Sequence, residues 1–368
     1  MILAETTNPG PAKSEHLGER PVVILGAGNL GRRVTQALRH AGITPLAFCD
    51  NNRQLWGGSV AELPVLSPAD AAQRFPDALF LVAIWHPTLC EGLRHHIASL
   101  RALGCKHIDT FISVLRQFPK HMPPNLFWED PQKLAAHREA AATARALLDE
   151  EGKAEFDRQW RFRLEGDPYC LAEPDPTPQY FPPQLVRLSG SECFVDCGAY
   201  DGDTLRVFLE HTGGSFARYI GLEPEPSIFA RLKEAASRMN GHAERIAVYP
   251  YAVGAKRETL SFSAAGEGSS VSANGELIVE SVALDELLAA ERPTFIKMDI
   301  EGYELEALAG ARHTIQRCRP KLAVCVYHRP DHLWCVPLAM HELLPNSRMT
   351  LRSHMQDGFD TVCYCLPE

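Results

Sequence analysis

The sequence predicts an α/β protein with two domains, each built on a doubly wound parallel β-sheet. A glycine turn joins a short apolar run to a helical pattern at residues 22–40, and a second such turn does so at residues 194–205. The chain has 368 residues, of which 45% are hydrophobic. That length exceeds one ordinary core and is sufficient for two.

The first 19 residues are rich in proline, glycine and mixed charges, which predicts a disordered tail and not a signal peptide. Residues 20–117 then predict a Rossmann-like domain of the nucleotide-binding type. Its glycine motif GxGxxG stands between a strand and a helix, and an acidic residue follows 24 positions after the first glycine. The predicted nucleotide site consists of Gly26, Gly28, Asn29, Leu30, Gly31 and Asp50.

The ligand of this first domain stays open among a nucleotide, NAD and a nucleotide-sugar. Segments 49–52, 63–67 and 79–84 resemble small Rossmann domains attached to sugar-nucleotide-modifying enzymes. No Tyr-x-x-x-Lys pair or Cys/His array accompanies the motif to deliver a hydride, and fold alone does not fix function. We therefore expect a binding or docking domain, with a purely structural domain and an active dehydrogenase as the alternatives.

Residues 118–188 predict a connector. Residues 133–164 have a helical composition with repeated apolar positions, which predicts an amphipathic helical pair. A proline-dense loop follows and carries Tyr180. The connector is either a spacer or a lid over the site of the second domain, and a hairpin at residues 258–282 with a Gly/Ser-rich tip is a second candidate for acceptor contacts.

The second domain, residues 189–368, predicts strands that end in polar side chains. Apolar runs end at Asp196, Glu223, Asp299 and His328. Because the carboxyl ends of parallel strands meet at one edge of a sheet, these side chains are expected to converge on a ligand site. Gly198 and Gly202 keep the first turn low enough for a ligand to approach the backbone.

The turn at residues 196–202 is neither GxGxxG nor a Walker loop, and is closer to the acidic-x-Gly-x-x-x-Gly turn of methyltransferases that use S-adenosylmethionine (SAM). Together with GLEPEPSIFARL, YAVG, FIKMDIEGYELEALAGA and VYHRPDHLW, it resembles the FkbM-type methyltransferases over residues 179–366. The resemblance implies the seven-stranded class I fold, SAM as methyl donor, and methylation of a hydroxyl on a sugar, a glycan or a secondary metabolite. The cofactor contacts that we predict are Tyr180, Asp196, Gly198, Ala199, Tyr200, Asp201, Gly202, Thr204, Glu223, Pro224 and Asp299.

Three residues are catalytic candidates: His328, Asp299 and Glu301. A hydroxyl acceptor must lose a proton, and an imidazole titrates near neutrality, so His328 is the candidate base. A purely structural histidine is the equal alternative. Asp299 and Glu301 would orient the acceptor or, less favoured, hold a divalent cation, and no metal is predicted. His332 is expected on the rim of a loop.

Composition limits the partners. The net charge of −9 argues against nucleic acid, which calls for a basic face. No apolar run approaches the roughly 18 residues of a membrane helix. Eleven cysteines without C-x-x-C spacing indicate a reducing cytoplasm and no zinc. A small molecule or glycan is the expected acceptor, and a homo-oligomer is left open. Two other functions are alternatives to the methyltransferase: an oxidoreductase acting through residues 20–115, and a non-catalytic nucleotide-binding protein.

Overall fold

The computed structural model of the protein describes residues 17–86, 91–122, 126–239, 241–263, 270–271 and 277–367. Residues 1–16 of the predicted tail and most of the predicted hairpin tip lie outside these ranges. The chain divides into two compact units. Unit 1 comprises residues 1–138, 157–174 and 355–359, and unit 2 comprises residues 139–156, 175–354 and 360–368.

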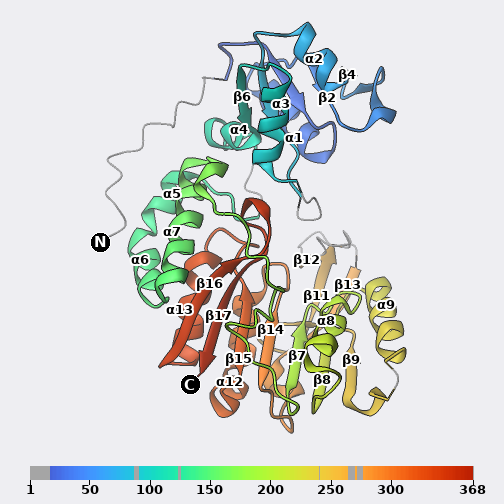
Figure 1. The fold of residues 1–368 in the computed structure, drawn as a ribbon, viewed down its shortest axis with the longest axis vertical. Helices are drawn as coiled ribbons and strands as arrows, with labels where there is room; N and C mark the ends of the chain where they lie inside the picture. Colours follow the sequence, from blue (N-terminus) through green and yellow to red (C-terminus); the bar gives the residue numbers. More distant parts are fainter. Residues whose placement is uncertain are drawn as a thin grey trace. The chain divides into compact units, whose positions relative to one another are not determined.

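Unit 1 is built on a six-stranded sheet in the order β3-β4-β2-β1-β5-β6 (Figure 1). All neighbours are parallel except β3 and β4. Such an order, in which the chain begins at the centre and winds outward in both directions, belongs to doubly wound sheets. Its elements are β1 (Val22–Leu25), α1 (Asn29–His40), β2 (Ala47–Cys49), β3 (Ser59–Val60), β4 (Leu63–Leu66), α2 (Pro68–Arg74), β5 (Leu79–Val82), α3 (Leu93–Ala102), β6 (His107–Thr110), α4 (Phe111–Gln117) and α5 (Pro131–Ala136).

Unit 2 is built on a seven-stranded sheet in the order β16-β17-β15-β14-β7-β8-β9, with β17 antiparallel to both of its neighbours. Figure 1 shows β16 and β17 at one edge and β9 at the other. The strands are β7 (Cys193–Cys197), β8 (Arg218–Leu222), β9 (Ile246–Tyr249), β14 (Phe295–Met298), β15 (Lys321–Cys325), β16 (Ser347–Ser353) and β17 (Thr361–Pro367). The helices are α8 (Asp203–Thr212), α9 (Pro226–Ser237), α10 (Leu284–Leu287), α11 (Glu304–Gly310), α12 (Arg312–Cys318) and α13 (His332–Leu343). This is the predicted class I methyltransferase fold.

A smaller sheet in unit 2 has the order β10-β13-β11-β12. Its strands are β10 (Tyr251–Val253), β11 (Glu258–Ser263), β12 (Ser270–Val271) and β13 (Leu277–Val282). The antiparallel pairing of β11 with β13 matches the hairpin expected from the sequence. Tyr251 begins a strand separate from β9.

The connector contains one more helix than the predicted pair: α5, α6 (Arg138–Ala146) and α7 (Glu150–Glu165). It does not form a unit of its own, because residues 139–156 group with unit 2 and the flanking residues group with unit 1. The apolar residues that predicted it, including Phe156 and Trp160, are buried as expected. A lid function for the connector stays a prediction.

The core of unit 2 explains why its central strands are apolar. All five residues of β7 are buried, since β7 lies between β14 and β8. Phe194 packs against Phe208, Phe295 and Phe181 with ring centroids 4.9–5.5 Å apart. Phe181 belongs to the proline-dense loop, so this loop is an integral part of the core of unit 2. Among the described residues, no helix is both long and apolar enough to cross a membrane.

Candidate active site

A pocket lies at the carboxyl ends of the central strands of unit 2. It contains about 450 Å³ of space not filled by atoms, part of which is open to solvent. Its lining residues are Gly198, Glu223, Pro224, Tyr251, Ala252, Val253, Asp299, Ile300, Glu301 and Tyr303. Of the four strand-end side chains that were expected to converge, Glu223 and Asp299 line this pocket together with Gly198, whereas Asp196 and His328 are not part of its lining.

Gly198 is needed for the shape of this pocket. Its φ is 78°, in the region that favours glycine, and a Cβ atom on it would lie 1.9 Å from the carbonyl oxygen of Asp299. The backbones after β7 and β14 can approach each other only because this side chain is absent.

We expect Gly198→Ala to lower the free energy of unfolding by about 1–3 kcal/mol, because both the clash and the left-handed backbone are costly. Gly213→Ala is the matched control, since Gly213 has a φ of 59° but nothing within 4 Å of its missing Cβ. Denaturant unfolding of both variants separates backbone strain from the clash. Equal losses in the two variants would contradict the close approach.

Glu223 follows β8 and is 7% exposed. Its carboxylate accepts hydrogen bonds from the backbone N–H groups of Glu225, at 2.9 Å, and of Tyr200. Burial nevertheless raises the pKa of Glu223 to about 7. A buried carboxylate of this kind is stabilised by ligand hydroxyl groups that donate to it, as the two ribose hydroxyls of an adenosine would.

Asp196 does not reach the pocket, contrary to the prediction that it contacts the cofactor. Its side chain is fully buried, 3.1 Å from the Lys297 ammonium, and it accepts a 2.7 Å hydrogen bond from the Tyr219 hydroxyl. Asp196 and Lys297 are register partners in β7 and β14, so their side chains share one face of the sheet. Gly221, the partner of Asp196 in β8, has no side chain and leaves the space into which Tyr219 extends.

The Asp196–Lys297 pair holds the glycine turn in place. Burial raises the pKa of Asp196. Burial would lower the pKa of the Lys297 amine, but the negative charges around it, that of Asp196 foremost, together outweigh burial and raise this pKa. The Lys297 ammonium also donates a 2.7 Å hydrogen bond to the carbonyl oxygen of Gly198. The pair therefore positions the backbone that lines the pocket.

A cluster of carboxylates and imidazoles lies beside the pocket, after β14 and β15. His328 is surrounded by three carboxylates. Its Nδ1 lies 2.8 Å from Glu304 Oε1, and its Nε2 lies 3.2 Å from Asp299 Oδ1 and 3.7 Å from Glu301 Oε2. The other Glu304 oxygen lies 3.1 Å from His332 Nδ1.

Burial and charge set the protonation of this cluster. Burial alone would lower the pKa of His328, but the charges of Glu304 and Glu301 outweigh it and raise the pKa to about 10. Glu304 has no exposed side-chain surface, yet the two histidines hold the pKa of its carboxyl well below the usual range. Glu301 differs: burial raises its pKa to about 7, and 27% of its side chain is exposed. His328 is thus an imidazolium near neutral pH, and Glu301 is the group that titrates there.

Asp299, Glu304 and His328 also offer donor atoms within 4.8 Å of one another, a spacing that a metal ion could bridge. We interpret them as a hydrogen-bonded cluster. Glu304 Oε1 accepts from the backbone N–H of Ile300 at 3.0 Å and contacts His328, so its acceptor capacity is already used inside the protein. Mg²⁺ sites, by contrast, usually retain several waters.

The remaining predicted cofactor contacts do not line this pocket. Ala199, Tyr200, Gly202 and Thr204 lie in the turn after Gly198 and at the start of α8, and the Asp201 carboxylate binds Arg206 and Arg231. Tyr180 is 5% exposed, and its hydroxyl donates a 2.7 Å hydrogen bond to Asp299. Direct contact of these residues with a cofactor stays a prediction.

In unit 1, the predicted nucleotide site has the expected local geometry. Gly26 has a φ of 104°, and a Cβ on Gly31 would lie 1.9 Å from the Gly26 carbonyl oxygen, whereas nothing lies within 4 Å of a Cβ on Gly28. Asn29 and Leu30 begin α1. The two Asp50 oxygens each accept a 2.7 Å hydrogen bond, from the backbone N–H groups of Ala27 and Asn52. This arrangement favours a role of Asp50 in fixing the turn, and ribose binding stays a prediction.

Sequence reasoning missed three members of the site. His332 is fully buried and contacts Glu304, although it was expected on a loop rim, because α13 begins at this residue. Glu304 was treated only as part of a motif. Lys297 carried a usable signal: a lysine in the apolar run Phe-Ile-Lys-Met indicates a buried counter-charge.

Comparison with known proteins agrees with this geometry. Residues 196–355 match the family model described as the methyltransferase FkbM domain. The hexuronic acid methyltransferase AglP of Haloferax volcanii is 30% identical over 107 residues, a match that covers 27% of this chain and 44% of that protein. The chain thus matches less than half of the length of this curated relative.

A solved structure is similar over more of the chain. The crystal structure of Methyltransferase FkbM from Methylobacillus flagellatus KT aligns with a TM-score of 0.76 and 25% identity. The alignment covers 94% of this chain and 90% of that one, so it includes both units. With the family match and the class I sheet, this identifies residues 196–355 as an FkbM methyltransferase domain.

Proposed function

We propose that this protein transfers a methyl group from SAM to a hydroxyl group of a sugar, a glycan or a secondary metabolite. One observation carries the proposal: a single pocket is lined by the bare backbone at Gly198, the buried Glu223 carboxylate and the carboxylates of Asp299 and Glu301. SAM has the matching groups, namely ribose hydroxyls, an ammonium and a sulfonium. The FkbM domain supports the same donor.

The residues present fit SAM in three places. Glu223 would accept hydrogen bonds from the ribose hydroxyls, and Tyr251, Ala252 and Val253 would pack against the adenine. Asp299 would bind the ammonium. When bound, SAM supplies an electrophilic methyl group, and the pocket lowers the barrier chiefly by aligning donor and acceptor.

We assign the general base to Glu301 and not to His328, which revises the expectation from the sequence. A base must be unprotonated at working pH, and the pKa of His328 is raised to about 10. The Glu301 carboxyl, with a pKa of about 7, is poised between its two forms and lines the pocket. The positive charge of His328, whose Nε2 lies 3.2 Å from Asp299 Oδ1 and 3.7 Å from Glu301 Oε2, then keeps these two carboxylates in position.

The charge of the pocket favours a neutral hydroxyl over a carboxylate as the acceptor. Asp299, Glu301 and Glu223 all line it, and a lysine or arginine is absent from its lining as far as the described residues go. An acceptor carboxylate would be repelled by these acids, whereas a hydroxyl can donate its proton to one of them. AglP, a hexuronic acid methyltransferase, supports a sugar as the acceptor. Because a hexuronic acid carries both hydroxyls and a carboxylate, the choice of a hydroxyl rests on the acid lining of the pocket alone.

We expect Glu223→Ala to weaken binding of S-adenosylhomocysteine by roughly 10- to 100-fold, because the variant loses the hydrogen bonds that the two ribose hydroxyls would donate to the charged carboxylate. Asp50→Ala is the matched control, because it removes a carboxylate after a strand of the other unit and should leave this affinity unchanged. Calorimetric titration of the purified chain with S-adenosylhomocysteine, and separately with NAD, measures both.

The titrations also separate the alternatives. Binding of S-adenosylhomocysteine that is sensitive to Glu223→Ala supports the methyltransferase. Tight binding of NAD alone, abolished by Asp50→Ala, would instead place the chemistry at Gly26–Asp50 and favour an oxidoreductase. Binding of S-adenosylhomocysteine without methyl transfer to any sugar or hydroxylated acceptor would favour the non-catalytic nucleotide-binding protein.

A further inference from the structure

Tyr180 has a strained backbone at the edge of the proposed site. Its φ is 69°, a left-handed conformation that is rare for a bulky residue and costs about 1–3 kcal/mol. Such a conformation persists only where the surrounding contacts impose it. Here it places the Tyr180 hydroxyl 2.7 Å from Asp299 Oδ2, with the ring 5.1 Å from the Lys297 ammonium.

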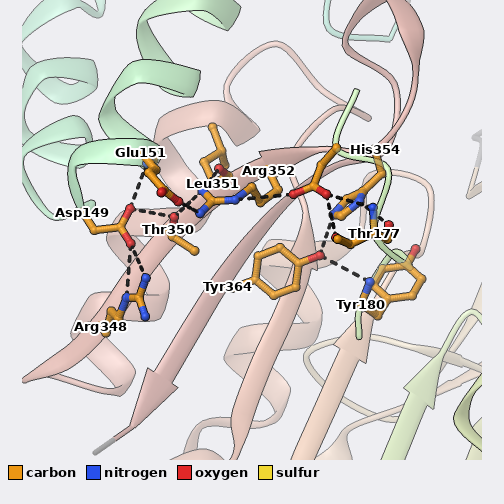
Figure 2. Close-up of polar contacts among 12 residues, drawn as sticks. Asp149, Glu151, Thr177, Tyr180, Arg348, Thr350, Leu351, Arg352, His354 and Tyr364 are labelled. Atoms are coloured by element: carbon orange, nitrogen blue, oxygen red, sulfur yellow. Dashed lines mark hydrogen bonds and ion pairs between the residues drawn. The ribbon is translucent and has the colours of Figure 1, made fainter. Parts of the chain in front are cut away.

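The contacts that impose this conformation come from β17 and from the end of β16. The backbone N–H of Tyr180 donates to the Tyr364 hydroxyl at 3.3 Å, and that hydroxyl lies 2.8 Å from His354 Nε2 (Figure 2). Tyr364 is fully buried in the middle of β17. The Tyr180 backbone is therefore held from a strand 184 positions away in the sequence.

The donors and acceptors along this path are consistent with one arrangement of protons. His354 Nδ1 lies 3.2 Å from the carbonyl oxygen of Thr177, so Nδ1 carries the hydrogen. Burial lowers the pKa of His354, which favours the neutral ring, and its Nε2 then accepts from the Tyr364 hydroxyl. This leaves a lone pair of that hydroxyl for the Tyr180 N–H.

The segment before Tyr180 is fastened to β16, the strand beside β17. The backbone N–H of Asp175 donates to the Ser353 carbonyl oxygen at 2.8 Å, and its carboxylate lies 3.7 Å from Arg352 Nε. The other Asp175 oxygen accepts from Thr177. Residues 175–180 thus have little freedom to relieve the strain at Tyr180.

We propose that Tyr364 and His354 are positioning residues for cofactor binding: they hold Tyr180 so that its hydroxyl fixes the Asp299 carboxylate in the pocket. The inference rests on the proposed function, because it uses Asp299 as the group that binds the SAM ammonium. Asp299 Oδ1 faces His328 Nε2, and Oδ2 faces Tyr180. Oδ1 also accepts a hydrogen bond of 3.5 Å from the Tyr327 hydroxyl, and Oδ2 accepts the one from Tyr180, so contacts on both oxygens determine the plane of the carboxylate.

The test is a double-mutant cycle on the full chain, with the dissociation constant of S-adenosylhomocysteine measured by calorimetry. We expect Tyr180→Phe to weaken binding about tenfold, since it removes a hydrogen bond to a charged group. We expect Tyr364→Phe to weaken it about three- to tenfold. The double variant should match Tyr180→Phe, because Tyr364 acts only through the hydroxyl that is already missing.

Tyr169→Phe, a change at a half-exposed tyrosine of unit 1, is the matched control and should bind like the unaltered chain. Melting temperatures of all variants are recorded, and a purely structural role of Tyr364 would lower them without changing affinity. Binding by Tyr364→Phe equal to that of the control, or additive losses in the double variant, would overturn the inference alone. Failure of the unaltered chain to bind S-adenosylhomocysteine would overturn the proposed function and the inference together.

Discussion

Replacing Glu301 by glutamine is expected to lower the rate of methyl transfer by about 100-fold or more, the usual contribution of a positioned general base. The change keeps the size and shape of the side chain and removes only its ability to take a proton. Glu301 has a φ of 55°, a strained backbone for a residue other than glycine, and such strain concentrates at functional sites. Its side chain lines the pocket beside Asp299.

The pH profile distinguishes a base from a binding group. Because burial raises the pKa of Glu301 to about 7, the rate of the unaltered protein at saturating SAM should rise with pH through about 7 as the carboxylate forms. Saturation with SAM removes the parallel effect of Glu223, whose pKa is also raised to about 7, on cofactor binding. The Glu301→Gln variant should lack this rise. The rate is measured as release of S-adenosylhomocysteine, with whichever sugar acceptor supports the fastest transfer by the unaltered protein.

Glu234→Gln is the control for this prediction. Glu234 is an exposed carboxylate on α9, is paired with Arg238 and does not line the pocket, so its loss should leave rate and profile unchanged. A Glu301→Gln variant whose rate stays within about threefold of the control would remove Glu301 from the base role. Asp299 would then be the next carboxylate to test.

The second large effect is on stability: His328→Ala is expected to lower the free energy of unfolding by about 3–5 kcal/mol. His328 has a side chain only 1% exposed, and it lies against Glu304, whose side chain is fully buried. Removing the imidazolium takes away the nearest positive charge of the buried Glu304 carboxylate, although the backbone N–H of Ile300 still donates to it. The loss would occur without any role of His328 as a base.

The pH dependence of this loss has a definite sign. The pKa of His328 is raised from 6.5 to about 10 in the folded protein, so its charge stabilises the fold fully below pH 6.5. That contribution disappears as the pH rises through 10. The difference in unfolding free energy between the unaltered protein and His328→Ala should therefore shrink between pH 6.5 and 10.

Denaturant unfolding at several pH values measures this difference. His313→Ala is the control, because His313 is exposed on α12 and should cost little at any pH. A His328→Ala loss below about 1 kcal/mol at pH 6.5 would show that the cluster is not held by charge. A loss that did not change with pH would assign it to packing instead.

Much of the site was predictable because its signals are local. An apolar run that ends in a polar residue, followed by glycine and a helical pattern, predicts the carboxyl end of a parallel strand from a few neighbouring residues. Gly198, Glu223, Asp299 and Glu301 were located in this way, and all four line one pocket. Glu304 and His332 escaped notice because each is the first residue of a helix, and the two side chains that contact each other are 28 positions apart in the sequence.

The sequence by itself determined the two parallel sheets and the edge at which the site forms, since these depend on apolar periodicity and on glycine positions. Only the tertiary structure decided what each ionisable group does there. Asp196 looked like a cofactor ligand, but its carboxylate pairs with Lys297 and accepts a hydrogen bond from Tyr219, because strand register places all three side chains on one face of the sheet. His328 looked like a base but carries a proton, because folding surrounds it with three carboxylates. A side chain's chemistry depends on its neighbours in space, and a pattern along the chain does not specify them.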